Sequence, residues 1–154
     1  MALATTAASP ALACKSERGF DPAYVTHAES VVVGRVSAYQ IVEPGGRSYA
    51  RFRMVVEEVI FGNPPRVLAV TWDDTNGGEY DTLQPGSYLI ALRDGRPQNA
   101  RLGRWTILQQ ACAPPFIWTS DSIMADRVRN AVEATNRVRF PTPREPLTVR
   151  PQPG

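Results

Sequence analysis

Few residues of this chain have side chains suited to catalysis. Among the 154 residues there is one histidine, His27, and there are two cysteines, Cys14 and Cys112. A hydrolytic triad needs a nucleophile, a base and an orienting acid, and catalytic zinc takes three protein ligands. The sequence has no G-x-S-x-G motif and no glycine-rich phosphate loop. We therefore expect a protein that is not an enzyme, with no cofactor and no metal site, and His27 as a surface or capping residue.

An acidic and turn-rich segment, residues 73–81, is the one stretch whose oxygen atoms could hold a calcium ion. Its spacing does not match an EF-hand loop. A solvated loop is therefore the favoured interpretation.

The beginning of the chain resembles the end of a signal peptide. Residues 1–13, MALATTAASPALA, are small and uncharged, and Ala11, Leu12 and Ala13 fit the small-x-small pattern before a cleavage site. The pattern lacks a positive region, so we interpret these residues as a signal-peptide remnant and expect a periplasmic or secreted bacterial protein. A disordered N-terminus of a cytosolic protein is the alternative. No segment reaches the roughly 20 apolar residues of a membrane span.

The two cysteines are compatible with three states. An even number of cysteines beside an export signal predicts one disulfide, between Cys14 and Cys112. Two unpaired thiols are the alternative. Cys14 could instead be acylated, because a cysteine at a cleavage site is a lipoprotein signal.

Period-two alternation predicts a mainly β protein. Between residues 47 and 72 the chain is expected to form a long strand and a shorter one, joined by a turn at Gly62. On the long strand, apolar Ala50, Phe52, Met54 and Val56 alternate with Arg51, Arg53, Val55 and Glu57. One face of this strand is therefore apolar, and the other begins cationic and ends mixed.

Other segments complete a helix–five strands–helix order. Further strands are expected at residues 31–39, with a bulge at Gly34, and at residues 87–93 and 105–111. A short helix follows Asp21, and a longer one covers about residues 121–136, capped by Thr119 or Ser120. Its apolar stripe is expected to contain Met124, Val128, Ala131, Val132 and Thr135.

This order predicts a single domain over residues 14–139. It is a five-stranded barrel of the oligonucleotide/oligosaccharide-binding (OB) type, flanked by a short N-terminal and a longer C-terminal helix. An SH3-like barrel or a small sandwich is the competing architecture. The proline-rich residues 140–154 are expected to form a disordered tail. The three tryptophans, Trp72, Trp105 and Trp118, are expected in the core.

Three segments in this order carry a resemblance to a known family: AESVVVGRV at residues 28–36, FRMVVEEVIFG at residues 52–62 and LQPGSYLI at residues 83–90. Together with an early and a late cysteine, they resemble bacterial secreted domains similar to tissue inhibitors of metalloproteinases, a netrin-module type of OB fold. The resemblance implies that the amino nitrogen and carbonyl oxygen of Cys14 chelate the zinc of a target protease, with Cys112 as the disulfide partner of Cys14. The chain departs from that family at Ser16, which stands where the inhibitors have a second cysteine.

We therefore expect an exported, non-enzymatic OB-fold binding domain with a protein partner, for which the resemblance implies a protease. A single-stranded nucleic-acid binder is the first alternative, with Arg51, Arg53, Tyr49 and Tyr80 as the groove. The export signal, the predicted disulfide and a net charge of only +2 disfavour nucleic acid. An envelope lipoprotein acylated at Cys14 is the second alternative.

Overall fold

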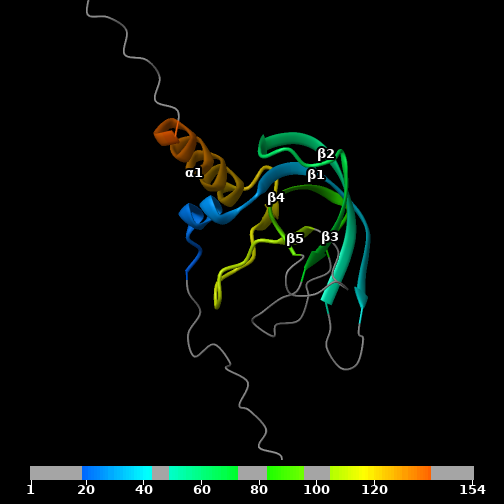
Figure 1. Ribbon diagram of the computed structural model, residues 1–154. Helices are drawn as coiled ribbons and strands as arrows, with labels where there is room; N and C mark the ends of the chain where they lie inside the picture. The colour runs from blue at the N-terminus through cyan, green and yellow to red at the C-terminus, as the bar shows by residue number, and fades with distance from the viewer. Residues whose placement is uncertain (1–18, 43–48, 73–82, 96–104, 140–154) are drawn as a thin grey trace, which may run out of the picture.

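The computed structural model describes residues 19–42, 49–72, 83–95 and 105–139. The elements in chain order are a 3₁₀ helix η1 (Pro22–His27), the strands β1 (Ser30–Val42), β2 (Tyr49–Phe61), β3 (Val67–Trp72), β4 (Gly86–Asp94), β5 (Trp105–Ile107) and β6 (Ile117–Thr119), and the helix α1 (Ile123–Arg139) (Figure 1). The expected signal-peptide remnant, Cys14, the acidic segment 73–81 and the tail 140–154 lie outside the described residues.

Five of the strands close into a barrel. The strands are hydrogen-bonded in the order β1-β2-β3-β5-β4, and β4 pairs with β1 to complete the ring. The β3–β5 pairing is parallel, and the other pairings are antiparallel. This arrangement confirms the predicted OB-type barrel between two terminal helices.

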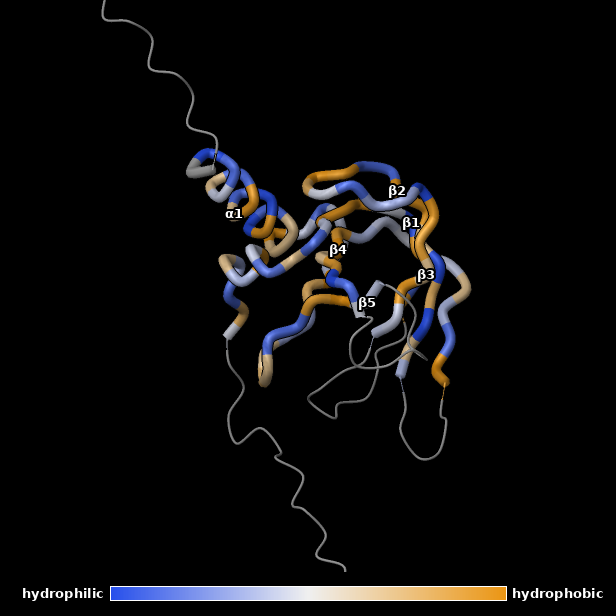
Figure 2. The backbone as a smooth tube through the Cα atoms, viewed as in Figure 1, coloured by the Kyte–Doolittle hydropathy of each residue, from blue (hydrophilic) through white to orange (hydrophobic). Residues whose placement is uncertain are grey.

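The first part of β1 and the middle of β4 are buried on both faces, which explains why these stretches contain continuous apolar runs. On β1, Val32 and Val36 point into the barrel, whereas Val31 and Val33 contact an outer apolar cluster. On β4, Ile90 belongs to the barrel interior and Leu89 to the outer cluster. Figure 2 shows these strands as largely hydrophobic.

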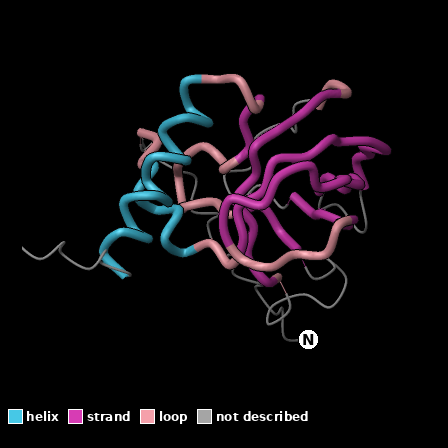
Figure 3. Tube along the Cα trace, turned by 90° about the horizontal axis from the view of Figure 1, so that it is seen from above, coloured by secondary structure: helices cyan, strands magenta, loops and turns pink. Residues whose placement is uncertain are grey.

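The outer cluster is covered by the two helices, which lie on one side of the strands (Figure 3). α1 contributes Ala125, Val128 and Val132, which are buried. The predicted burial of Val128 and Val132 is confirmed. At the start of the stripe the prediction was one residue too early, because Ala125 is buried and Met124 is partly exposed.

The cap of α1 differs from the prediction. The hydroxyl of Ser122 accepts a hydrogen bond from the backbone N–H of Ala125 at 3.2 Å and donates to the carbonyl oxygen of Thr119 at 2.8 Å. Ser122 is therefore the N-cap, in place of Thr119 or Ser120. At η1 the predicted cap is confirmed, since Asp21 accepts from the N–H of Ala23 at 3.0 Å.

The predicted strand at residues 105–111 was too long. β5 ends at Ile107, and the chain leaves the sheet before returning as β6, which also pairs with β4. The N–H of Phe116 donates to the carbonyl oxygen of Leu108 at 2.9 Å, which closes the excursion at its base. β5 and β6 thus pair one after the other with the same edge of β4. We call residues 109–115, which lie between these two strands, the excursion.

Glycine is required at two positions of β1 and β2. The predicted bulge at Gly34 is confirmed, because the β1–β2 register shifts between Val33 and Gly34. Gly62 directly follows β2 with φ of +83°, a conformation that side chains disfavour. A Cβ atom at Gly62 would also lie 2.9 Å from the hydroxyl oxygen of the buried Ser30.

Candidate functional site

A groove on the outside of β1, β2 and β3 is the candidate site. Arg51 and Arg53 point outward from β2, because the alternating residues Phe52 and Met54 fill the barrel. This confirms the cationic and apolar faces expected for the strand. The groove has a volume of about 430 Å³. β3, which forms one wall, lies on the side of the barrel away from α1 (Figure 1).

Uncharged residues lie opposite the two arginines on the neighbouring strands. Across the β2–β3 pair, Thr71 lies opposite Arg51 and Ala69 lies opposite Arg53. On the other side, Gln40 of β1 lies opposite Arg51. None of these three neighbours carries a charge that could pair with the guanidinium groups.

Neither Arg51 nor Arg53 forms an ion pair with any residue that the structure describes, and both are exposed. By contrast, three other arginines contact carboxylates: Arg35 with Glu57, Arg129 with Glu58 and Arg137 with Glu133. Guanidinium groups bind carboxylates and phosphates through paired hydrogen bonds. Two neighbouring arginines without acidic partners in the described part of the chain therefore form a suitable site for an anion.

The outer face becomes apolar further along β2. Val55 and Val67 lie opposite each other across the β2–β3 pair, and their exposed fractions are 40% and 43%. We call these two residues the valine pair. Val67 lines the groove, and Val55 lies beside it on β2. The outer face of β2 and β3 thus has a cationic end at Arg51 and Arg53 and an apolar end at the valine pair.

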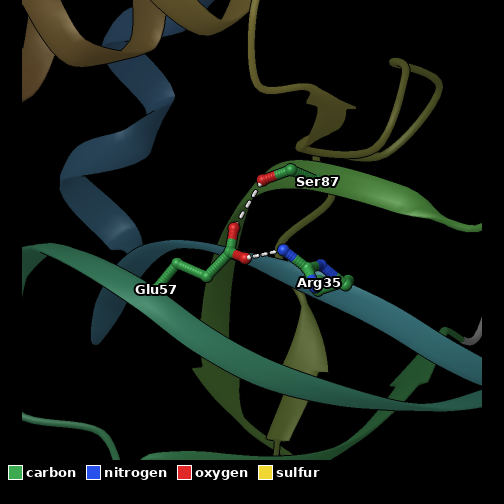
Figure 4. Close-up of polar contacts among 3 residues, drawn as sticks. All are labelled: Arg35, Glu57 and Ser87. Carbon is green, nitrogen blue, oxygen red and sulfur yellow. Dashed lines mark hydrogen bonds and ion pairs between the residues drawn. The ribbon is translucent and has the colours of Figure 1, made fainter.

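A polar network flanks the apolar end, because Arg35 of β1 lies directly opposite Val55 across the β1–β2 pair. Glu57 of β2 accepts a hydrogen bond from Arg35 of β1 at 2.8 Å and another from the Ser87 hydroxyl of β4 at 2.9 Å (Figure 4). The three side chains come from three neighbouring strands, and both oxygens of the carboxylate are occupied. The carboxylate of Glu57 is therefore fully hydrogen-bonded at the surface, and Arg35 is already paired with it.

The residues predicted for nucleic-acid binding are only partly brought together. Arg51 and Arg53 share the groove. Tyr49 is buried, so it offers no exposed ring for base stacking, and that part of the prediction was wrong. Tyr80 lies outside the described residues.

Of the two cysteines, the structure describes Cys112, whereas Cys14 lies outside the described residues. Cys112 is in the excursion and has φ of +63°. The side chain of the buried Gln109 donates to the carbonyl oxygen of Ala113 at 3.1 Å, which ties the excursion together around Cys112. The disulfide and the role of Cys14 stay predictions.

The structure also describes the histidine and the three tryptophans that were considered in the sequence. His27 is exposed at the end of η1, with its ring 4.5 Å from that of Tyr24. Trp72 and Trp105 are buried in the barrel, as expected. Trp118 is partly buried in the outer cluster, where its ring contacts Phe20 at 5.1 Å.

Other locations offer less for a ligand. The cavity between η1 and α1, next to Val25 and Val132, has a volume of only about 10 Å³, which is at most the space of one water molecule. In the ranges 19–42, 49–72, 83–95 and 105–139, no group of three or more His, Cys, Asp or Glu residues is placed to hold a metal ion. No helix in this part of the chain is long and apolar enough to cross a membrane.

The sequence alone did not reveal the walls of the groove. Alternation along β2 identified the outward arginines, but Gln40, Ala69 and Thr71 become their neighbours only through the strand register.

A scan against protein families finds no match for this chain, and a search of curated proteins finds none either.

Proposed function

We propose that this chain is an exported, non-enzymatic binding domain of the OB type that holds an anionic partner in the groove of β1, β2 and β3. The observation that carries the proposal is the pair Arg51 and Arg53, exposed in one groove without an acidic partner among the described residues. The same outer face of strands 2 and 3 is the ligand-binding face of OB barrels in general.

The composition of the groove supports binding over catalysis. Its polar side chains include guanidinium, amide and hydroxyl groups, with no thiol, imidazole or carboxylate among the described lining residues. Guanidinium groups remain charged at all physiological pH values, so they are poor general bases but good electrostatic anchors. A partner with carboxylate groups is the protein ligand that such a groove favours.

Binding of a fluorescent decaglutamate peptide to the full chain, followed by anisotropy, tests this proposal. An exposed ion pair contributes about 0.2–1 kcal/mol, so the double variant R51Q/R53Q should weaken binding on the order of tenfold. Binding should also weaken as salt rises, because exposed charges are screened. Decalysine should not bind.

Arg93→Gln is the matched control. Arg93 is exposed on β4, outside the groove, and has no acidic partner in the described ranges. If R93Q weakens binding as much as R51Q/R53Q does, the peptide recognises net charge, and the groove is not the site.

A second candidate function is the metalloprotease inhibition that the resemblance implies, through Cys14. One contact favours it: Phe20 packs on Phe116 with ring centroids 4.8 Å apart, and Phe116 follows the excursion that carries Cys112. Six residues after Cys14, the chain therefore contacts the residue that follows the excursion. At about 3.3 Å per extended residue, this length allows Cys14 to reach Cys112.

The test of this candidate is the intact mass of the exported protein, followed by inhibition assays with zinc proteases. A mass that begins at Cys14 and gains two alkyl groups only after reduction supports the candidate. A mass raised by acyl chains instead supports the lipoprotein alternative, because acylation blocks the amino group that would chelate zinc.

A further inference from the structure

We infer that the partner in the groove is an extended acidic peptide segment with an apolar side chain next to its acidic ones, in an acid-x-acid-x-apolar order along one direction. This inference rests on the proposed function and specifies its ligand. It is carried by the change in chemistry along β2 and β3 and by the spacing of the strand.

The outward residue pairs change stepwise along the two strands. The pairs are Arg51 with Thr71, then Arg53 with Ala69, then Val55 with Val67. Successive outward residues of a strand are two positions apart, or about 6.6 Å. The surface therefore presents two cationic positions and one apolar position at regular intervals.

An extended peptide has the same repeat, because its side chains alternate between two faces at the same rise per residue. Two of its carboxylates at positions i and i+2 can thus face Arg51 and Arg53, while the side chain at i+4 covers the valine pair. Burying the exposed parts of these valines is favourable in proportion to the apolar area removed from water.

The network at Glu57 supports one order of the ligand. Glu57 follows Val55 on the same face of β2, and its charge would repel an acidic side chain placed at that end. Arg35, which lies opposite Val55, is paired with Glu57 at 2.8 Å. Acidic groups are therefore expected at the Arg51 end, with the apolar group at the end next to Glu57.

Single-stranded nucleic acid fits this surface less well. Bases bind such grooves by stacking on exposed aromatic rings. The described residues that line the groove include one aromatic residue, Phe52, which is buried in the barrel. The valine pair lies where the next phosphate group would fall, so a uniformly charged backbone would leave the apolar end unused.

The experiment compares three labelled probes on the full chain. The first is a peptide with the pattern Asp-Ser-Asp-Ser-Leu, made in both chain directions. The second replaces leucine by serine, and the third is a ten-nucleotide oligothymidylate. We expect the leucine peptide to bind roughly fivefold more tightly than the serine peptide, because each buried CH₂ group contributes appreciably.

The variant V55T/V67T tests the apolar end without removing β-branched side chains from the strands. It should abolish the preference for leucine and leave binding of the serine peptide unchanged. Val59→Thr is the matched control, because Val59 is a similarly exposed valine of β2, at 47%, that lies beyond the part of β2 paired with β3. It should keep the preference.

The outcomes separate this inference from the proposed function. Equal binding of both peptides, lost in R51Q/R53Q, would overturn the inference and leave the anion-binding groove intact. Tighter binding of the oligothymidylate than of either peptide would overturn the peptide as the partner. A failure of all three probes to bind would overturn both proposals.

Discussion

Gly34 of β1 lies so close to β2 that a Cβ atom on it would collide with the carbonyl oxygen of Val55. The same atom would lie 2.8 Å from the terminal methyl group of Met54 in the barrel interior. The close approach occurs at the bulge, where the register of the two strands shifts. The curvature that closes the barrel therefore depends on the absence of a side chain at this position.

Gly34→Ala should lower the free energy of unfolding by about 2–3 kcal/mol, because a backbone carbonyl must move to admit the methyl group. Denaturant titration measures this change. Gly86→Ala is the control, since a Cβ atom there would make an ordinary contact with Tyr88 at 3.6 Å. Equal stability of the two variants would show that the strands at Gly34 separate without cost.

Ser122→Ala should destabilise the protein by about 1 kcal/mol, because the N–H of Ala125 loses its capping partner. Ser120→Ala should have a much smaller effect, since no hydrogen bond of the Ser120 side chain is found in the described structure. Thermal unfolding of both variants by circular dichroism measures the difference. A larger loss in S120A would restore Ser120 as the cap.

The ion pair between Glu58 of β2 and Arg129 of α1, at 2.9 Å, should contribute little to the docking of the helix. A double-mutant cycle with E58Q and R129Q should give a coupling of about 0.2–1 kcal/mol that falls at high salt. Val128→Ala, in the buried stripe of α1, should cost about 2 kcal/mol or more. A coupling energy larger than the cost of V128A would mean that charge, and not apolar burial, holds α1 in place.

The predicted disulfide between Cys14 and Cys112 should stabilise the protein by an amount on the order of 4 kcal/mol, because it closes most of the chain into one loop. Denaturant midpoints with and without reductant measure this contribution. Alkylation of both thiols in the unreduced protein would show that the cysteines are free and would remove the support for inhibition through Cys14.

The barrel could be predicted from the sequence because β2 alternates clearly, β1 and β4 contain continuous apolar runs, and the bulge carries a glycine. The break between β5 and β6 could not, since residues 105–111 contain no proline or glycine that would mark the end of a strand. The break is determined by tertiary contacts: Ala91 accepts from the N–H of Leu108 and donates to the carbonyl oxygen of Phe116.

The candidate site, too, could be predicted only in part from the sequence. The outward direction of Arg51 and Arg53 follows from the alternation of β2 alone. The burial of Tyr49 and the position of Val67 beside Val55 depend on which strands meet and in which register. A single sequence contains no local signal for these contacts.

The most direct test of the account is a map of backbone amide shifts during titration of the full ¹⁵N-labelled chain with the Asp-Ser-Asp-Ser-Leu peptide. We expect saturable shifts concentrated at Gln40, Arg51, Arg53, Ala69 and Thr71, with smaller ones at the valine pair. Shifts centred on α1 or on the network at Glu57, with the groove unchanged, would contradict it.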